Sequence, residues 1–214
     1  MCAVQELQTI DNPAFHRVDL GDGAFLEEVR GFVREDAAVM AALCSELHLA
    51  AETIVLFGRP VPVPRLVAYH GDPGRFYRYS GRDHAPVPWP PVLGAIRAQL
   101  CAATGTPYDS VLCNYYRDGA DSMGRHADDE PELGPLPDDV RIASISLGAR
   151  RTFRMRPKGG GPRLDFELGG GDLFVMGGTT QQRFVHEIPR TRRAVGPRLN
   201  LTFRCVTPRG EGHA

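Results

Sequence analysis

From residue 111 onward the sequence is divided into short segments that have the length and residue alternation of β-strands. Glycine, proline and aspartate separate these segments, and all three residues favour turns over strand interiors. The segments expected to be strands are 111–117, 141–148, 151–156, 163–168, 172–176, 183–188 and 198–206. Short strands in this number and spacing are typical of a double-sheet jelly roll. We therefore predict a mainly β (α+β) fold with a jelly-roll core, a double-stranded β-helix, over residues 111–206.

The sequence before this core contains two helical patterns. A helix is expected at 36–47, with Asp36 placed to cap its first turn. A second helix is expected at 91–103, because proline favours a first helical turn and a glycine follows its end. Residues 18–33 are expected to form a strand and a short helix.

The segment at the end of the core alternates strictly. Its apolar face comprises Leu199, Leu201, Phe203 and Cys205, and its polar face comprises Arg198, Asn200, Thr202 and Arg204. A polar face of this kind is usual for an edge strand with one side in water. Two arginines with hydrogen-bonding residues between them would equally suit a dicarboxylate, because guanidinium groups bind carboxylates through paired hydrogen bonds.

Upstream, His126 and Asp128 lie two residues apart, and His186 follows much later. On an extended segment, residues i and i+2 point to the same side, so the imidazole and the carboxylate would face one point. Most such pairs are a surface carboxylate near a histidine. Completed by a distant histidine, the pair would form the two-histidine, one-carboxylate site that binds iron(II) and leaves positions open for oxygen. Together with the arginine strand, this pattern suggests an iron oxygenase that uses 2-oxoglutarate.

Five stretches in a fixed order carry a family resemblance over nearly half of the chain. They are Asn114–Gly119, Gly124–Glu130, Ile142–Gly148, His186 and Pro197–Arg204. In this order they resemble the AlkB family of iron(II)/2-oxoglutarate-dependent nucleic-acid demethylases, and most closely its members that act on duplex DNA. Weaker similarity continues upstream to about residue 54.

The resemblance implies a catalytic centre in which His126, Asp128 and His186 bind iron(II), with O2 and 2-oxoglutarate as co-substrates. The residues expected to bind 2-oxoglutarate are Asn114, Tyr116, Arg198, Asn200, Thr202 and Arg204. By chemistry alone, Asn114 and Tyr116 could equally be the ordinary polar side of a strand. The implied reaction is oxidative demethylation repair of N-alkylated bases in DNA, such as 1-methyladenine and 3-methylcytosine, with release of formaldehyde, succinate and CO2.

The resemblance also implies that residues 1–110 supply N-terminal helices and a nucleotide-recognition lid. A strand at 54–57 enters a turn that carries Phe57, Gly58 and Arg59. In duplex-acting family members the corresponding aromatic residue wedges into the base stack, which helps a base to leave the helix. The alternative for Phe57 is a place in the core, where most aromatic residues lie.

Three further residues are expected to bind the flipped base. Tyr77 and Tyr79 share one side of a short strand, and the resemblance implies that Tyr79 stacks on one face of the base while His126 covers the other. A half-buried tyrosine strand is the alternative. Asp129 adjoins a metal ligand, and its carboxylate would favour methylated bases that carry a positive charge.

Charge is unevenly distributed, although the net charge is only −1. Residues 1–140 contain 11 arginines and 21 acidic residues, whereas residues 141–214 contain 14 basic and five acidic residues. A locally basic surface can hold a phosphate backbone even in a neutral protein. Arg190, Arg192 and Arg193 stand where duplex-acting family members carry a basic loop for the unmodified strand. The chain has only one lysine, however, so its arginine content could also reflect a compositional bias.

Other features limit the class of protein. Five cysteines without a C-x-x-C pair argue against a disulfide framework and predict reduced, mostly buried thiols. We expect no membrane span, because no apolar run approaches the roughly 18 residues that a span needs. We also expect no signal peptide, because the first seven residues lack a basic region and an apolar segment. With 214 residues the chain is expected to be a single domain (1–214) and a monomer. We expect a cytoplasmic protein, nucleoid-associated in a bacterium, whose partner is alkylated DNA, double- or single-stranded, or RNA.

Two other functions fit these residues. The protein could be a 2-oxoglutarate oxygenase that acts on RNA, protein or a small molecule. It could also be a non-enzymatic protein that binds alkylation damage without turnover, although the complete set of ligands and both arginines argue against this.

Overall fold

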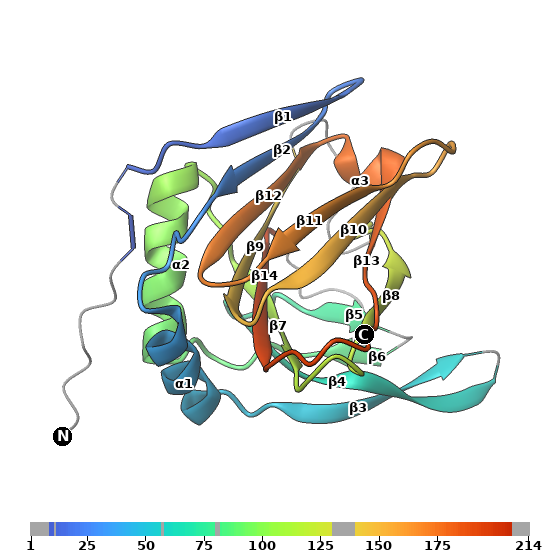
Figure 1. The fold of residues 1–214 in the computed structure, drawn as a ribbon. Helices are drawn as coiled ribbons and strands as arrows, with labels where there is room; N and C mark the ends of the chain where they lie inside the picture. The colour runs from blue at the N-terminus through green and yellow to red at the C-terminus, as the bar shows by residue number, and fades with distance from the viewer. Residues whose placement is uncertain (1–8, 11, 57, 80–81, 130–139, 207–214) are drawn as a thin grey trace.

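The computed structural model describes residues 9–10, 12–56, 58–79, 82–129 and 140–206. Within these ranges the chain forms a sandwich of two antiparallel sheets, with helices on one side (Figure 1). The larger sheet has the order β1 (His16–Gly21), β2 (Ala24–Val29), β12 (Asp172–Gly178), β9 (Arg141–Gly148), β14 (Arg198–Arg204), β7 (Ser110–Tyr116), β4 (Arg59–Gly71) and β3 (Ala50–Leu56). The smaller sheet has the order β11 (Leu164–Leu168), β10 (Arg151–Pro157), β13 (Phe184–Ile188) and β8 (Met123–His126). The predicted mainly β, jelly-roll fold is confirmed.

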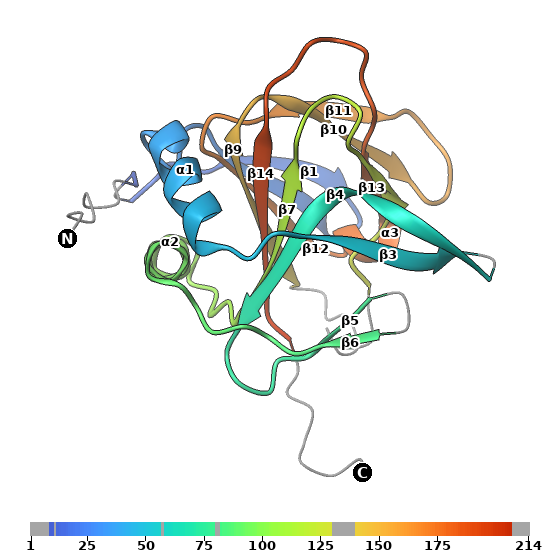
Figure 2. The same ribbon diagram turned by 90° about the horizontal axis from the view of Figure 1, so that it is seen from below.

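Two helices cover the outer face of the larger sheet, as Figures 1 and 2 show. They are α1 (Asp36–Glu46) and α2 (Pro91–Thr104), close to the predicted ranges. The prediction that Asp36 caps α1 is wrong, because the cap position is Glu35 and makes no side-chain hydrogen bond. Asp36 instead accepts a hydrogen bond from the backbone N–H of Gly148 at 2.7 Å, so its carboxylate ties the helix to the end of β9.

The alternation of β14 assigns its side chains to two different interiors. Leu199, Leu201 and Phe203 are completely buried in a core that the larger sheet shares with α1 and α2. A second core lies between the two sheets and includes Phe153 from β10 and Phe174 from β12. Because the polar face of β14 points toward this second interior, it is the face that can build a site.

The strand predictions for the core hold with small shifts, but two expectations about the cysteines are wrong. Cys205 lies beyond the end of β14 and is exposed, so it does not belong to the apolar face. The cysteines within the described ranges are free thiols, of which only Cys113 is fully buried.

Residues 18–33 form a β-hairpin instead of the expected strand and short helix. Asp22 and Gly23 both have positive φ, at 51° and 80°, and they connect β1 to β2 directly because Gly21 pairs with Ala24. An Asp-Gly pair with this backbone is a tight hairpin turn whose twist matches that of the strands. The hairpin extends the larger sheet beyond β12.

Three short elements lie outside the two large sheets. A small sheet pairs β5 (Tyr77–Tyr79) with β6 (Arg82–His84), and α3 (Thr180–Arg183) is a single turn just before β13. Among the described residues, no helix combines the length and the apolar character needed to cross a bilayer.

We predict that Asp172 contributes strongly to stability, because its completely buried side chain joins β12 to the end of β2. It accepts hydrogen bonds from Arg30 and Arg150, both at 2.8 Å, and from the backbone N–H of Gly31 at 2.9 Å. Asp172→Ala should lower the free energy of unfolding in urea by about 2–4 kcal/mol. The control Asp165→Ala breaks a largely exposed pair and should cost within about 1 kcal/mol; equal losses would contradict the prediction.

Candidate active site

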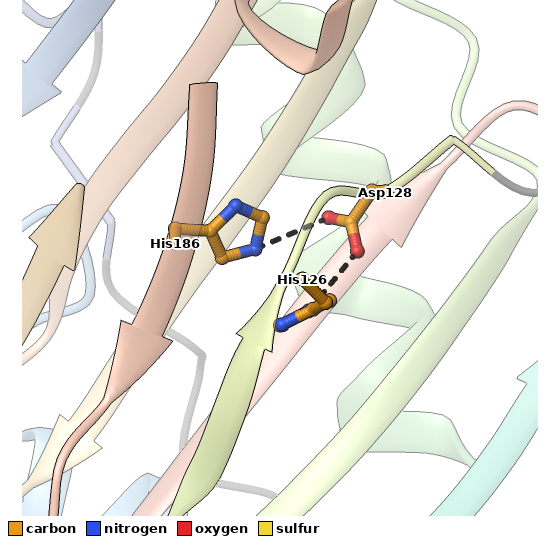
Figure 3. A group of neighbouring side chains, drawn as sticks. All are labelled: His126, Asp128 and His186. Atoms are coloured by element: carbon orange, nitrogen blue, oxygen red, sulfur yellow. Dashed lines mark ion pairs between the residues drawn. The ribbon is translucent and has the colours of Figure 1, made fainter. Parts of the chain in front are cut away.

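The two histidines of the predicted metal site lie opposite each other on neighbouring strands. His126 on β8 pairs in register with His186 on β13, and Asp128 follows just after β8 ends. Figure 3 shows the three side chains pointing toward one another. One ligand atom from each lies within 4.8 Å of the others, with His126 Nε2 at 3.5 Å and His186 Nε2 at 3.8 Å from the Asp128 carboxylate. The three residues can therefore hold one metal ion.

Buried partners fix the position of Asp128. Its Oδ1 accepts a hydrogen bond from Arg204 Nη2 at 2.7 Å, and its backbone N–H donates to Gln181 Oε1 at 2.9 Å. Only 1% of Asp128 is exposed. Gln181 lies on α3, so this short helix fastens the ligand loop to the sandwich, a support that carboxylate ligands commonly receive.

The imidazole rings are also held in place. His126 Nδ1 lies 2.9 Å from the carbonyl oxygen of Gly124, and because a carbonyl only accepts, Nδ1 donates and Nε2 remains free for a metal. Phe153 stacks beside His186 at a centroid distance of 5.1 Å. Each ring is thus oriented by a group that does not itself bind metal.

Two of the three residues already have the charge that a metal ligand requires. Burial, reinforced by the neighbouring His126, lowers the pKa of His186 to about 3, so this ring is neutral. Burial alone would raise the pKa of Asp128, but Arg204 and the histidines outweigh it, so the pKa is lowered and the carboxylate is ionised. Burial opposes protonation of His126, yet the hydrogen bond and charge of Asp128 raise its pKa overall. Metal binding would therefore displace a proton chiefly from His126.

The polar face of β14 does not face water, so the edge-strand interpretation is wrong. β14 is a central strand between β7 and β9, and Arg198, Asn200, Thr202 and Arg204 are all buried. Pairing places Asn200 between Asn114 of β7 and Ser146 of β9, and it aligns Arg198 with Tyr116. The neighbouring strands thus add their own polar side chains to the same surface.

Arg198 has buried hydrogen-bond donors that a ligand could engage. Its Nη2 donates to Ser146 Oγ at 2.7 Å and to Asn200 Oδ1 at 2.6 Å, whereas Nε and Nη1 are buried without a hydrogen-bond partner among the described residues. Burial lowers the pKa of Arg198 to about 10, which leaves it charged at neutral pH. Unsatisfied buried donors of a charged group are costly. The oxygen atoms of an anionic ligand would satisfy them, so the residues present fit 2-oxoglutarate.

The amides on this face are oriented by their neighbours. Asn200 Oδ1 also accepts from the hydroxyls of Ser144 and Ser146, and its Nδ2 donates to Thr202 Oγ1 at 2.9 Å. Asn114 Oδ1 accepts from Arg65 Nε at 2.6 Å, which leaves the amide N–H groups of Asn114 available. Both asparagines therefore have a fixed orientation.

The metal-site residues and the polar face of β14 surround one cavity of about 40 Å³. It is lined by the three metal-site residues, by the six residues predicted to bind 2-oxoglutarate, and by Leu112, Met123, Ser144, Phe153, Met176, Glu187 and Ile188. The structure thus brings together all nine predicted metal and co-substrate residues.

Sequence reasoning missed several residues that support this site, namely Arg65, Ser144, Ser146, Phe153 and Gln181. The two serines alternate within the stretch that resembles the AlkB family, a signal that could have placed them on the inner face. No local pattern reveals Gln181, because its contact with Asp128 spans 53 residues.

The residues predicted to bind the base are only partly described. The β3–β4 hairpin projects from the sandwich, and Gly58 (φ 76°) and Arg59 are exposed at its end (Figure 1). Phe57 and the side chains of Tyr77 and Tyr79 lie outside the described residues. Asp129 is exposed and forms an ion pair with Lys158 at 3.2 Å.

Most basic residues of the C-terminal half are paired with acidic ones, which the charge count could not reveal. Ion pairs join Arg150 to Asp172, Arg154 and Arg163 to Asp165, and Lys158 to Asp129. By contrast, Arg190, Arg192 and Arg193 are exposed, and no carboxylate of the described residues forms an ion pair with them. The surface available to a phosphate backbone is therefore narrower than the count implies.

Comparisons with known proteins agree with this geometry. The family model that describes the 2OG-Fe(II) oxygenase superfamily matches residues 29–204. DNA oxidative demethylase ALKBH2 from Mus musculus is 41% identical over 167 residues, which cover 74% of this chain and 69% of the relative. Alpha-ketoglutarate-dependent dioxygenase alkB homolog 3 from Mus musculus is 37% identical over 194 residues, which cover 85% and 66%. ALKBH2 from Homo sapiens is 39% identical, and the match covers 73% of this chain and 62% of that protein.

The chain thus spans about two thirds of the length of these relatives. A solved structure of OsALKBH1 superposes with a TM-score of 0.58 at 18% identity, covering 88% of this chain and 99% of that one, which shows the shared fold. The matched superfamily, the identities and the buried His126–Asp128–His186 cluster together show that this chain is an iron(II)- and 2-oxoglutarate-dependent dioxygenase of the AlkB family.

Proposed function

We propose that this enzyme repairs DNA by oxidative demethylation of N-alkylated bases such as 1-methyladenine and 3-methylcytosine, with release of formaldehyde, succinate and CO2. The observation that carries the proposal is the single cavity in which the His126–Asp128–His186 cluster adjoins the unsatisfied donors of Arg198. The ALKBH2 relatives, whose names describe DNA oxidative demethylases, support DNA as the substrate class.

An N-methyl group needs this kind of site because its C–H bonds resist acid–base and nucleophilic groups. Iron(II), with O2 and 2-oxoglutarate, supplies the oxidant that attacks such bonds, and the protein supplies binding and orientation. His126, Asp128 and His186 would hold the metal. The neutral imidazole of His186 and the ionised carboxylate of Asp128 suit a metal ion as they are, whereas His126 would lose a proton when the metal binds.

Arg198 and Arg204 would bind 2-oxoglutarate beside the metal. The unsatisfied Nε and Nη1 of Arg198 would each donate a charge-assisted hydrogen bond to an oxygen of the co-substrate. Arg204 already donates to Asp128, so it would contribute mainly charge while keeping that ligand in place. Asn114, Tyr116 and Thr202 line the same cavity and would complete the polar contacts, while Asn200 orients its neighbours.

The DNA would reach this cavity from the side of the β3–β4 hairpin. Gly58 and Arg59 are exposed there, and we propose that Phe57 between the two strands acts as a wedge in duplex substrates. Tyr77, Tyr79 and Asp129 would contact the flipped base. These roles rest on the family resemblance and on the exposed position of the hairpin.

We predict that anaerobic enzyme with iron(II) and 2-oxoglutarate releases formaldehyde from methylated DNA oligonucleotides once oxygen is admitted. Asp128→Ala should abolish this release without unfolding the protein, because it removes a metal ligand. Asp165→Ala, which changes a carboxylate that does not line the cavity, should retain activity. The panel should include methylated RNA and free methylated nucleosides.

Formaldehyde release from RNA but not from DNA would show that the substrate is RNA and not DNA. Lesion binding that is unchanged by His186→Ala, with no formaldehyde from any substrate, would support the non-enzymatic alternative. A fully active Asp128→Ala variant would remove Asp128 from the metal site.

We also predict that Asp129 favours cationic lesions. Asp129→Asn should lower kcat/KM for 1-methyladenine by about tenfold, or ~1.4 kcal/mol, because a partly solvated carboxylate loses its attraction to the charged base. The same change should alter kcat/KM for the neutral lesion 1-methylguanine by no more than about twofold, because this base carries no charge for Asp129 to attract. Competition between the two lesions in one oligonucleotide mixture measures the ratio directly. Equal losses on both lesions would indicate a structural role for Asp129.

A further inference from the structure

Arg151, at the start of β10, is a buried arginine that the proposed chemistry does not use. Its side chain donates to three backbone carbonyl oxygens, those of Asp118, Asp121 and Pro189, each at 2.9 Å. Only 3% of the residue is exposed, so Arg151 cannot itself reach a phosphate group. Its role must therefore be exerted through the segments whose carbonyls it binds.

These carbonyls belong to two segments at the same end of the sandwich. Asp118 and Asp121 lie in the turn 117–121 that follows β7, and Pro189 follows β13 directly. We call residues 189–197 the arginine loop, because they contain the exposed Arg190, Arg192 and Arg193. In Figure 2 this loop, which joins β13 to β14, rises beside the turn after β7.

A second contact docks the arginine loop onto the turn. The backbone N–H of Thr191 donates to the carbonyl oxygen of Gly119 at 2.9 Å. There is no room for a side chain at Gly119, because a Cβ atom would lie 2.5 Å from the Thr191 oxygen and 3.2 Å from the Arg193 oxygen. The segments are therefore packed backbone against backbone, with Arg151 beneath them.

The chemistry of the contact requires a guanidinium group. Its planar fork presents several N–H donors in fixed directions, so it can satisfy carbonyls from separate segments at once, which a lysine ammonium does less well. Burial lowers the pKa of Arg151, whereas Tyr116 and Asp121 oppose this effect. The guanidinium carbon also lies 5.7 Å from the ring centroid of Tyr116, which faces the co-substrate cavity.

We propose that Arg151 is a positioning residue that holds the arginine loop against the 117–121 turn, so that Arg190, Arg192 and Arg193 can bind a phosphate backbone together. The inference rests on the proposed function for the identity of the ligand, nucleic acid. It goes beyond that function by assigning phosphate affinity to a buried residue that touches no phosphate.

The salt dependence of DNA binding tests this role. Each phosphate contact contributes about 0.9 to the slope of log Kd against log salt concentration for duplex DNA. Replacing all three loop arginines by alanine should therefore lower the slope by up to about 2.7. Arg151→Met should lower the slope by a similar amount, although the buried residue contributes no contact of its own. Binding of a labelled methylated duplex is measured with iron(II) and 2-oxoglutarate in the absence of oxygen.

Arg154→Met is the matched control, because Arg154 lies on the same strand but pairs with Asp165 at the surface. Its slope should stay close to that of the unmodified protein. When Arg151→Met is combined with the three alanine substitutions, the slope should fall no further than with either change alone. Additive losses, or an unchanged slope in Arg151→Met, would overturn the inference.

Gly119→Ala provides a second test that removes no charge and keeps Arg151. The added methyl group must push the arginine loop away from the turn, so the slope should again fall. An unchanged slope would contradict the inference even if Arg151→Met failed to fold. If the three alanine substitutions leave the slope unchanged, the loop binds no phosphate and the inference fails.

Formaldehyde release separates this inference from the proposed function. Loop-dependent binding of the duplex without formaldehyde release would refute demethylation and leave the positioning role of Arg151 intact. Demethylation with equal slopes in Arg151→Met, Arg154→Met and the unmodified protein would refute only the role of Arg151.

Discussion

The burial of the polar face of β14 is the constraint on which the site depends. β14 has hydrogen-bonded neighbours on both sides, its apolar face packs against α1 and α2, and its polar face enters the sandwich. Two guanidinium groups are thereby enclosed, and buried charges need partners. Arg204 donates a hydrogen bond to Asp128. Ser146 and Asn200 accept hydrogen bonds from Arg198 but use only one of its three guanidinium nitrogens. The fold thus leaves a buried positive charge beside the metal ligands that a bound anion would compensate.

The metal ligands and the co-substrate surface come from different sheets, and only the sandwich brings them together. His126 and His186 belong to the smaller sheet, and the polar surface belongs to β7, β14 and β9 of the larger one. The ion pair between Arg204 and Asp128 bridges the two. Since the same arginine lines the co-substrate cavity, occupation of one site should stabilise the other. Recognition of the nucleic acid is left to segments at the rim, the β3–β4 hairpin and the arginine loop.

The sequence revealed the local patterns that specify this architecture, but it did not reveal which residues contact each other in the folded protein. Alternation in 198–204 revealed both faces of β14, yet whether that strand lay at an edge depended on pairing with β7 and β9. Asp36 had the sequence signature of a cap, but tertiary contact with Gly148 decided its role. The residues matching the AlkB family located the ligands, whereas Arg65, Gln181 and Arg151 act over long sequence distances. The count of basic residues similarly hid their pairing with Asp165 and Asp172.

The most direct test of the central claim is an anaerobic titration of the iron(II)-loaded protein with 2-oxoglutarate, comparing the unmodified chain with Arg198→Met. Loss of two charge-assisted hydrogen bonds should raise the Kd by about 100-fold, or ~3 kcal/mol, while iron(II) binding stays intact. An unchanged affinity for 2-oxoglutarate in a folded, iron-loaded Arg198→Met variant would contradict the assignment of the buried β14 surface to the co-substrate.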